Sequence, residues 1–145
     1  MAKTTEEIAN EMDAANSIEE IMEILEKYNI GRQTFGDRLL ELCAQYGVKT
    51  SELQKNVAVS KSQFYAAVNG TREPSKETVL KIAITLGVTQ EEINELLKLA
   101  KHKELYAKNN EDAIILFGLN KKMDIYEIDN LLKQYDSKIR LLDEE

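Results

Sequence analysis

Apolar residues recur at helical spacing through almost the whole chain. Between residues 34 and 101, apolar positions three and four residues apart predict five helices in succession. A residue type that favours a helix N-cap precedes each of these stretches: Thr34, Thr50, Ser60, Ser75 and Thr89. Three of the stretches end next to a glycine, which can adopt the left-handed conformation that stops a helix: Gly47, Gly70 and Gly87. The pattern therefore predicts an all-α domain over residues 34–101.

Residues 1–33 form a separate amphipathic arm in this pattern. Thr4-x-x-Glu7 and Ser17-x-x-Glu20 are capping-box patterns, and each opens a run of apolar residues at helical spacing. The polar face of the second run is acidic. Such an arm either pairs with a second subunit or folds back on its own domain, and the sequence favours neither. Residues 29–33, with Gly31, predict a linker.

Residues 102–145 predict a helical C-terminal extension. Asn109 or Asn110 opens one helix, and Asp124-x-x-Glu127 opens another. The second of these repeats the pattern of residues 92–98 at residues 127–133. This similarity reflects either an internal duplication or the residue pattern that capped amphipathic helices generally share. Three apolar residues near the C-terminus are expected to close the extension: Ile139, Leu141 and Leu142.

The stretch from Thr50 to Gly70 contains two short helical patterns joined by a tight break at residues 57–59. Its apolar residues are expected to turn inward: Leu53, Val57, Val59, Phe64, Ala67 and Val68. The outward positions on the second helix are then Lys61, Ser62, Tyr65, Ala66 and Asn69. Two short helices arranged in this way form a helix-turn-helix.

The same region resembles the phage-repressor-like (Cro/cI/Xre) family of DNA-binding domains, from about Phe35 to Leu97. Four features carry the resemblance: Gly47, Val59-Ser60, the segment from Gly70 to Pro74-Ser75, and Leu86-Gly87-Val88. It implies a five-helix, lambda-repressor-like helix-turn-helix domain with flanking helical extensions. It also implies a transcriptional regulator of the Xre type that binds duplex DNA as a homodimer on a symmetric operator, without a cofactor.

By the same resemblance, the second helix of the pair enters the major groove with four base-facing residues: Lys61, Ser62, Tyr65 and Ala66. Lys61 can donate to guanine O6 and N7, whereas Ala66 offers only an apolar surface where many family members carry a long polar side chain. Phosphate contacts are expected from residues at the helix ends: Thr50, Ser51, Asn69, Thr71 and Arg72. We assign Gln63 to the helix cap rather than to base contact. Three lysines give either distant electrostatic help or ordinary solvated charge: Lys49, Lys55 and Lys76.

The net charge of −7 is unusual for a DNA-binding protein. It is unevenly distributed, because residues 1–33 carry eight acidic and three basic residues, whereas residues 49–81 carry six basic and three acidic residues. Of these two stretches, only the expected DNA-facing one is positive. The acidic balance and Ala66 also fit an alternative, a protein-interaction module that has kept the fold. An antitoxin or phage-encoded protein whose terminal helices hold a protein partner is a third reading.

Catalysis finds little support in the sequence. The chain has one cysteine and one histidine, which cannot form a standard zinc site. His102 lies in a charged run and is expected on the surface, and Cys43 is expected to be a small buried residue. No apolar run is long enough to span a membrane, and the N-terminus lacks a signal-peptide pattern. We therefore expect a cytoplasmic protein that is not an enzyme.

Overall fold

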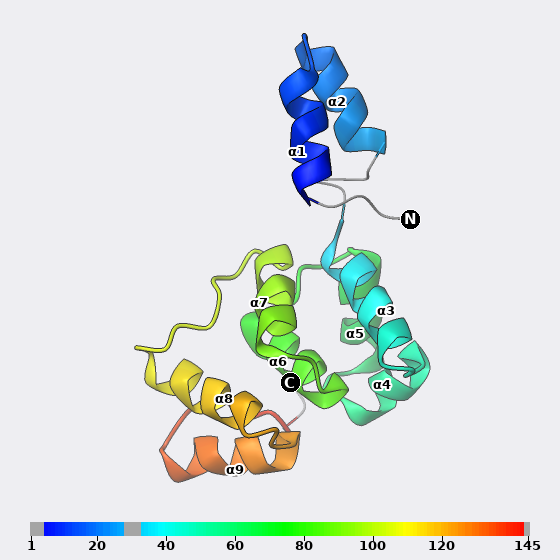
Figure 1. Cartoon of the computed structure of the whole chain (residues 1–145). Helices are drawn as coiled ribbons and strands as arrows, with labels where there is room; N and C mark the ends of the chain where they lie inside the picture. Colours follow the sequence, from blue (N-terminus) through cyan, green and yellow to red (C-terminus); the bar gives the residue numbers. More distant parts are fainter. Residues whose placement is uncertain (1–4, 28–32, 144–145) are drawn as a thin grey trace. The chain divides into compact units, whose positions relative to one another are not determined.

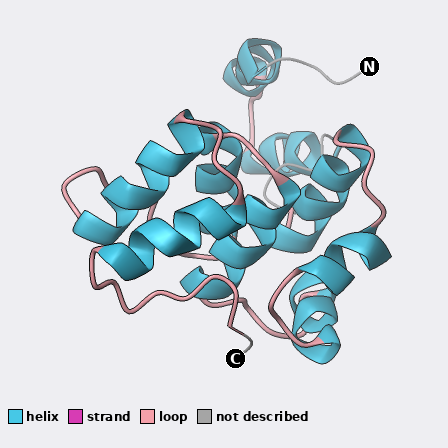
Figure 2. Ribbon diagram, turned by 90° about the horizontal axis from the view of Figure 1, so that it is seen from below, coloured by secondary structure: helices cyan, strands magenta, loops and turns pink. Residues whose placement is uncertain are grey.

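The computed structural model describes residues 5–27 and 33–143. Over these residues the chain has nine α-helices (Figure 1). Figure 2 shows only helices and loops in the described parts, which confirms the expected all-α class. The helices fall into two compact units, one within residues 1–33 and one within residues 34–145.

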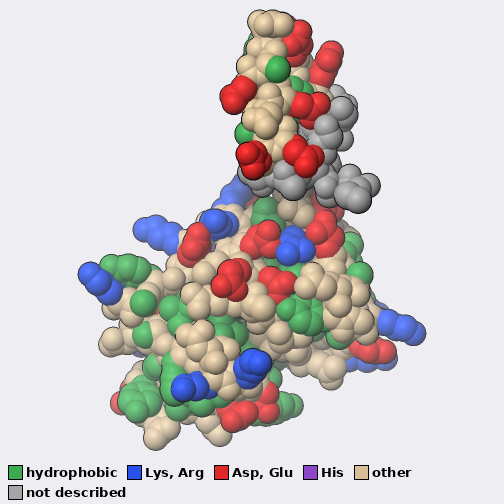
Figure 3. All heavy atoms as spheres, in the orientation of Figure 1, with side chains coloured by type: hydrophobic (Ala, Val, Ile, Leu, Met, Phe, Trp, Pro, Cys, Tyr) green, Lys and Arg blue, Asp and Glu red, His purple; other side chains and the backbone are tan. Residues whose placement is uncertain are grey.

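The first unit is a pair of short helices, α1 (Thr5–Ala14) and α2 (Ile18–Lys27), which contact each other. The Ser17 hydroxyl accepts a hydrogen bond from the Glu20 amide at 3.2 Å, which confirms the predicted cap. Acidic side chains are spread over the visible face of this pair in Figure 3. On α2, Ile18 and Met22 are 66% and 58% exposed. The predicted Thr4 cap and nearly all of the predicted linker lie outside the described residues.

The second unit contains α3 (Phe35–Gln45), α4 (Thr50–Asn56), α5 (Lys61–Asn69), α6 (Lys76–Leu86), α7 (Gln90–Leu99), α8 (Asn110–Asn120) and α9 (Ile125–Gln134). The predicted capping residues hold because each hydroxyl, amide or carboxylate accepts a bond from a backbone amide in the first turn. The confirmed caps are Thr34, Ser60, Ser75, Thr89, Asn109 and Asp124. Local sequence therefore sets where most helices of this unit begin.

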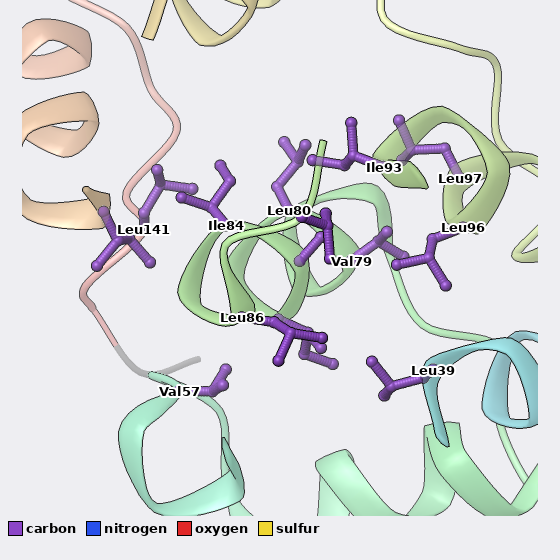
Figure 4. Close-up of a cluster of buried hydrophobic side chains, with 14 of the residues drawn as sticks. Leu39, Val57, Val79, Leu80, Ile84, Leu86, Ile93, Leu96, Leu97 and Leu141 are labelled. Atoms are coloured by element: carbon purple, nitrogen blue, oxygen red, sulfur yellow. The ribbon is translucent and has the colours of Figure 1, made fainter. Parts of the chain in front are cut away.

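Helix α6 lies at the centre of the second unit. Its residues from Thr78 to Ile84 are buried on every side, and α4, α7 and α9 all contact it. Figure 4 shows Val79, Leu80 and Leu86 among side chains from the surrounding helices. A helix that is apolar around its whole circumference must be surrounded by others, which explains this central position.

Helices α8 and α9 pack on each other and reach the rest of the unit through α7 and α6. The expected boundary between residues 101 and 102 lies inside this compact unit. Leu141 is fully buried, and Ile139 and Leu142 are partly buried against the core, as expected for residues that close the extension. Phe117 of α8 is exposed although it is a large apolar residue. Apolar residues occupy several faces of α8, and one helix cannot bury them all in one core.

Candidate nucleic-acid interface

The helix-turn-helix consists of α4 and α5 joined by residues 57–60. Val57 and Val59 are buried at either side of Ala58, which fixes the turn to the core. Ser60 has an extended backbone, and its hydroxyl accepts from the Gln63 amide at 3.1 Å, so α5 begins abruptly after it. The first turn of α5 contains no acidic residue, which leaves the positive end of its dipole uncompensated by side chains of that turn.

The four expected base-facing residues do not share one environment. Lys61 and Ser62 are exposed in the first turn of α5. Tyr65 and Ala66 are half-buried, and the Tyr65 ring meets the Phe64 ring edge-on with the centroids 5.2 Å apart. The structure thus presents the leading turn of α5 fully and its middle only in part.

Asn69, Thr71 and Arg72 are all exposed just beyond α5. Gly70 ends the helix in the left-handed conformation, with a φ of 77°. The amides of Thr71 and Arg72 both donate to the Ala66 carbonyl, at 3.0 and 3.3 Å. This loop is therefore held firmly enough to present its polar side chains at one end of the helix.

The expected N-cap role of Thr50 is wrong. Lys49 occupies the cap position without a side-chain hydrogen bond, and Thr50 is the first helical residue. Thr50 is half-buried and forms a side-chain hydrogen bond with Cys43, a buried residue as expected. Burial raises the pKa of the Cys43 thiol, and the bond with Thr50 opposes this only in part. Ser51 remains exposed, so of this expected pair it presents the more accessible hydroxyl.

The expected capping box at α5 is only half present. Ser60 caps the Gln63 amide, but the Gln63 side chain does not return to the Ser60 backbone. Its Oε1 atom is buried without a hydrogen-bond partner in the structure. Gln63 lines a hollow of about 250 Å³ between α5 and the start of α6, together with Arg72 and Thr78.

Two of the basic residues in the positively charged stretch are engaged within the protein. Lys81 is fully buried, and Lys76 forms an ion pair with buried Asp112 at 2.7 Å. Neither lysine is therefore a freely solvated charge of the kind considered for Lys76. Lys101, which the sequence did not single out, pairs with Glu73 at 2.8 Å in the loop before α6. Lys61 and Arg72 remain as exposed cations at the two ends of α5.

The described residues also bear on the metal, histidine and membrane questions that the sequence raised. No group of three or more histidine, cysteine, aspartate or glutamate side chains is placed to hold a metal ion there. His102 is half-buried rather than at the surface, because its Nε2 atom lies 2.8 Å from the Pro74 carbonyl oxygen. Among the described helices, none has the length and apolar character for a membrane crossing.

Comparison with known proteins identifies this region. Residues 38–98 match the family model of the Cro/C1-type HTH DNA-binding domain. No curated protein and no solved structure gave a match. The matched range runs from within α3 to the last turn of α7 and includes the whole of α4, α5 and α6. Over residues 38–98, the chain therefore carries a DNA-binding domain of the Cro/C1-type helix-turn-helix family.

Proposed function

We propose that this protein is a transcriptional regulator of the Xre type that binds duplex DNA sequence-specifically, as a homodimer on a symmetric operator. The observation that carries the proposal is the exposure of Lys61 and Ser62 on the first turn of α5, within a Cro/C1-type domain. In this class of domain the leading turn of the second helix meets base edges in the major groove.

The residues of α5 differ in how selectively their side chains would contact bases. Lys61 donates to guanine O6 and N7, and Ser62 donates or accepts with less selectivity. Ala66 suits a thymine methyl group, and Tyr65 contacts a base or a phosphate through its hydroxyl. Because Tyr65 and Ala66 are half-buried, most of the base preference rests on Lys61.

Phosphate contacts would flank the recognition helix. Asn69, Thr71 and Arg72 are exposed at its C-terminal end. Thr50 and Ser51 lie in the first turn of α4, where backbone amides lack a side-chain cap. These groups position the domain on the duplex without reading sequence, because phosphates carry no base information.

The dimer is proposed from the exposed apolar faces outside the matched domain. Ile18 and Met22 lie one turn apart on α2 and are both more than half exposed. A second apolar patch lies on α8 and α9, and its members are Ala113, Ile114, Phe117, Leu131 and Tyr135. Either face provides a contact for a second copy. A two-fold dimer places its recognition helices one DNA turn, about 34 Å, apart.

A second candidate is a protein-interaction module with weak DNA binding. The patch on α8 and α9 favours it, because an apolar hollow that includes exposed Phe117 and Tyr135 is a contact surface rather than a nucleic-acid surface. The net charge of −7 also weakens non-specific attraction to phosphate. In this candidate the terminal helices would hold the protein partner.

Selection from a random duplex library at two salt concentrations, followed by titration of variants, tests the proposal. We expect Lys61→Ala to weaken binding to the selected duplex by about 1–3 kcal/mol and to relax base preference. We expect Arg72→Ala to weaken all duplexes similarly and to reduce the salt slope by about 1. Lys103→Ala, which removes an exposed charge outside the matched domain, is the control. Equal losses on every duplex for both variants would contradict the base-reading assignment, and no enrichment at low salt would favour the interaction module.

A further inference from the structure

The C-terminal segment of residues 137–143, which we name the C-terminal strap, is hydrogen-bonded to α6 at two of its residues, Arg140 and Asp143. The Arg140 amide donates to Glu77 Oε1 on α6 at 3.0 Å. The Leu141 amide donates to Asp129 Oδ1 on α9 at 2.7 Å. Asp129 is itself buried, so the second bond lies inside the protein. The strap is thus fixed through its backbone to two different helices.

Side-chain packing holds the strap at the same place. Leu141 is fully buried, and Figure 4 shows it beside Ile84 of α6. Glu77, Lys81 and Ile84 are four and three residues apart, so they lie on one face of α6. The strap therefore covers a single stripe of the central helix.

Lys81 connects this strap to the helix-turn-helix. Its side chain is 0% exposed, and its Nζ atom donates to the Asp143 carbonyl at 2.6 Å and to the Ala58 carbonyl at 3.2 Å. Ala58 is in the turn between α4 and α5, two residues before the Ser60 cap. An ammonium group taken out of water must keep its hydrogen bonds, because leaving them unmade is costly. Lys81 therefore holds the strap and the turn to one point of α6.

We infer that Lys81 is a positioning residue for DNA binding, and that the C-terminal strap sets the placement of the recognition helix through it. This inference rests on the proposed function, since it concerns how α5 is presented to DNA. The turn is only four residues long, so a shift of the Ala58 carbonyl is transmitted directly to Ser60 and the first turn of α5. The C-terminal extension then helps to position α5 in the DNA-binding domain.

The test compares Lys81→Met with Lys103→Met in the full-length chain by amide hydrogen exchange and by DNA titration. Lys81→Met keeps the length of the side chain and removes its donors, whereas Lys103 is an exposed residue outside the strap and the turn. The reporters are the amides of Val59 and Phe64, which donate within the turn and the first turn of α5. The Ile93 amide, which donates at the start of α7, serves as the internal reference.

We expect Lys81→Met to speed exchange at Val59 and Phe64 by at least about tenfold, because a buried charged hydrogen bond is lost, with little change at Ile93. The affinity for the duplex that the wild-type chain enriches from a random library should fall by about tenfold, while Lys103→Met leaves both readings unchanged. Equal acceleration at all three amides would indicate general destabilisation and overturn the inference. Unchanged exchange at Val59 and Phe64 would do the same.

Asp129→Ala keeps the inference testable if Lys81→Met does not fold. Asp129 lies on α9, outside the helix-turn-helix, and its loss loosens the strap at Leu141. Faster exchange at Val59 and Phe64 in this variant would support the coupling. Faster exchange at Leu141 alone would refute it. If the wild-type chain enriches no duplex, the proposed function fails, but the exchange measurements still decide whether the strap positions the turn.

Discussion

Substitution of Gly36 by alanine should move α5 without changing any residue of that helix. Gly36 is a buried residue in the first turn of α3, where this helix passes the end of α5. A Cβ atom added there would lie 1.9 Å from the Val68 carbonyl oxygen and 2.7 Å from the Val68 carbonyl carbon. Both atoms belong to the backbone of α5, so no side-chain rotation can relieve the overlap.

Two opposing contributions decide whether Gly36→Ala raises or lowers the free energy of unfolding. Alanine in place of glycine ordinarily stabilises a helix by about 0.5–1 kcal/mol. Here α5 would have to move away from α3 by roughly 1.5 Å, from 1.9 Å to the 3.4 Å of an ordinary contact, and overpacking of a filled core costs about 1–3 kcal/mol or more. We therefore expect Gly36→Ala to lower the free energy of unfolding by about 2 kcal/mol.

Urea denaturation monitored by circular dichroism measures this change, with Gly118→Ala as the matched control. A Cβ at Gly118 meets only the side chain of Ile128, at 2.5 Å, and that side chain has rotatable bonds. We expect the control to lose less stability than Gly36→Ala, because a side chain yields more readily than a backbone. A neutral or stabilising result for Gly36→Ala would refute the close contact between α3 and α5.

Two further predictions concern charged groups. Asp112→Ala should lower the free energy of unfolding by about 2 kcal/mol, because it removes a buried carboxylate from half-exposed Lys76 and from the Tyr106 amide. Glu104→Ala, which removes the exposed ion pair with Lys98, should leave the free energy of unfolding measured by denaturation unchanged. Burial opposes ionisation of Glu92, but hydrogen bonds from Thr89 and Tyr46 and the charge of Arg38 together lower the pKa of Glu92 below its usual 4.5. The stability that this lowered pKa contributes is present above pH 4.5 and is lost as the pH falls through the pKa of Glu92 in the folded protein. The free energy of unfolding of Glu92→Gln should therefore fall less steeply with decreasing pH in the acid range than that of the wild-type protein. An unchanged slope would contradict this role of Glu92.

The sequence predicted the helices well because their starts are encoded locally. Ser60, Ser75 and Thr89 each satisfy an amide three residues away, and no distant contact is needed for that. Gly70 and Gly87 likewise end their helices through their own backbone conformation. The family resemblance was confirmed for the same reason, since its features are these local signals.

The misassigned residues are those whose side-chain partners lie outside their own helix. Thr50 is a good N-cap type, yet its hydroxyl bonds to Cys43 on a neighbouring helix. Lys81 entered the sequence analysis only in the charge count of residues 49–81, and nothing local shows that a carbonyl 62 residues away would accept a hydrogen bond from its ammonium group. His102 likewise lies in a charged run but turns inward to the Pro74 carbonyl.

The candidate site itself was only partly foreseeable. Helical spacing placed Lys61 and Ser62 outward, and both are exposed. It could not show that Tyr65 and Ala66 would be half-covered, because that depends on how the rest of the domain packs around α5. The roles of all these residues toward DNA remain predictions that the binding experiments decide.

The buried thiol gives the protein a built-in reporter. Cys43 is the only cysteine of the chain and lies inside the helix next to α4, with a pKa raised by burial. The thiolate attacks an alkylating reagent and displaces its leaving group, so this sulfur atom is modified only when neighbouring helices separate and admit solvent. The rate of labelling of the wild-type chain therefore measures how often the domain opens. Slower labelling in the presence of duplex DNA would detect DNA binding without an added fluorescent label.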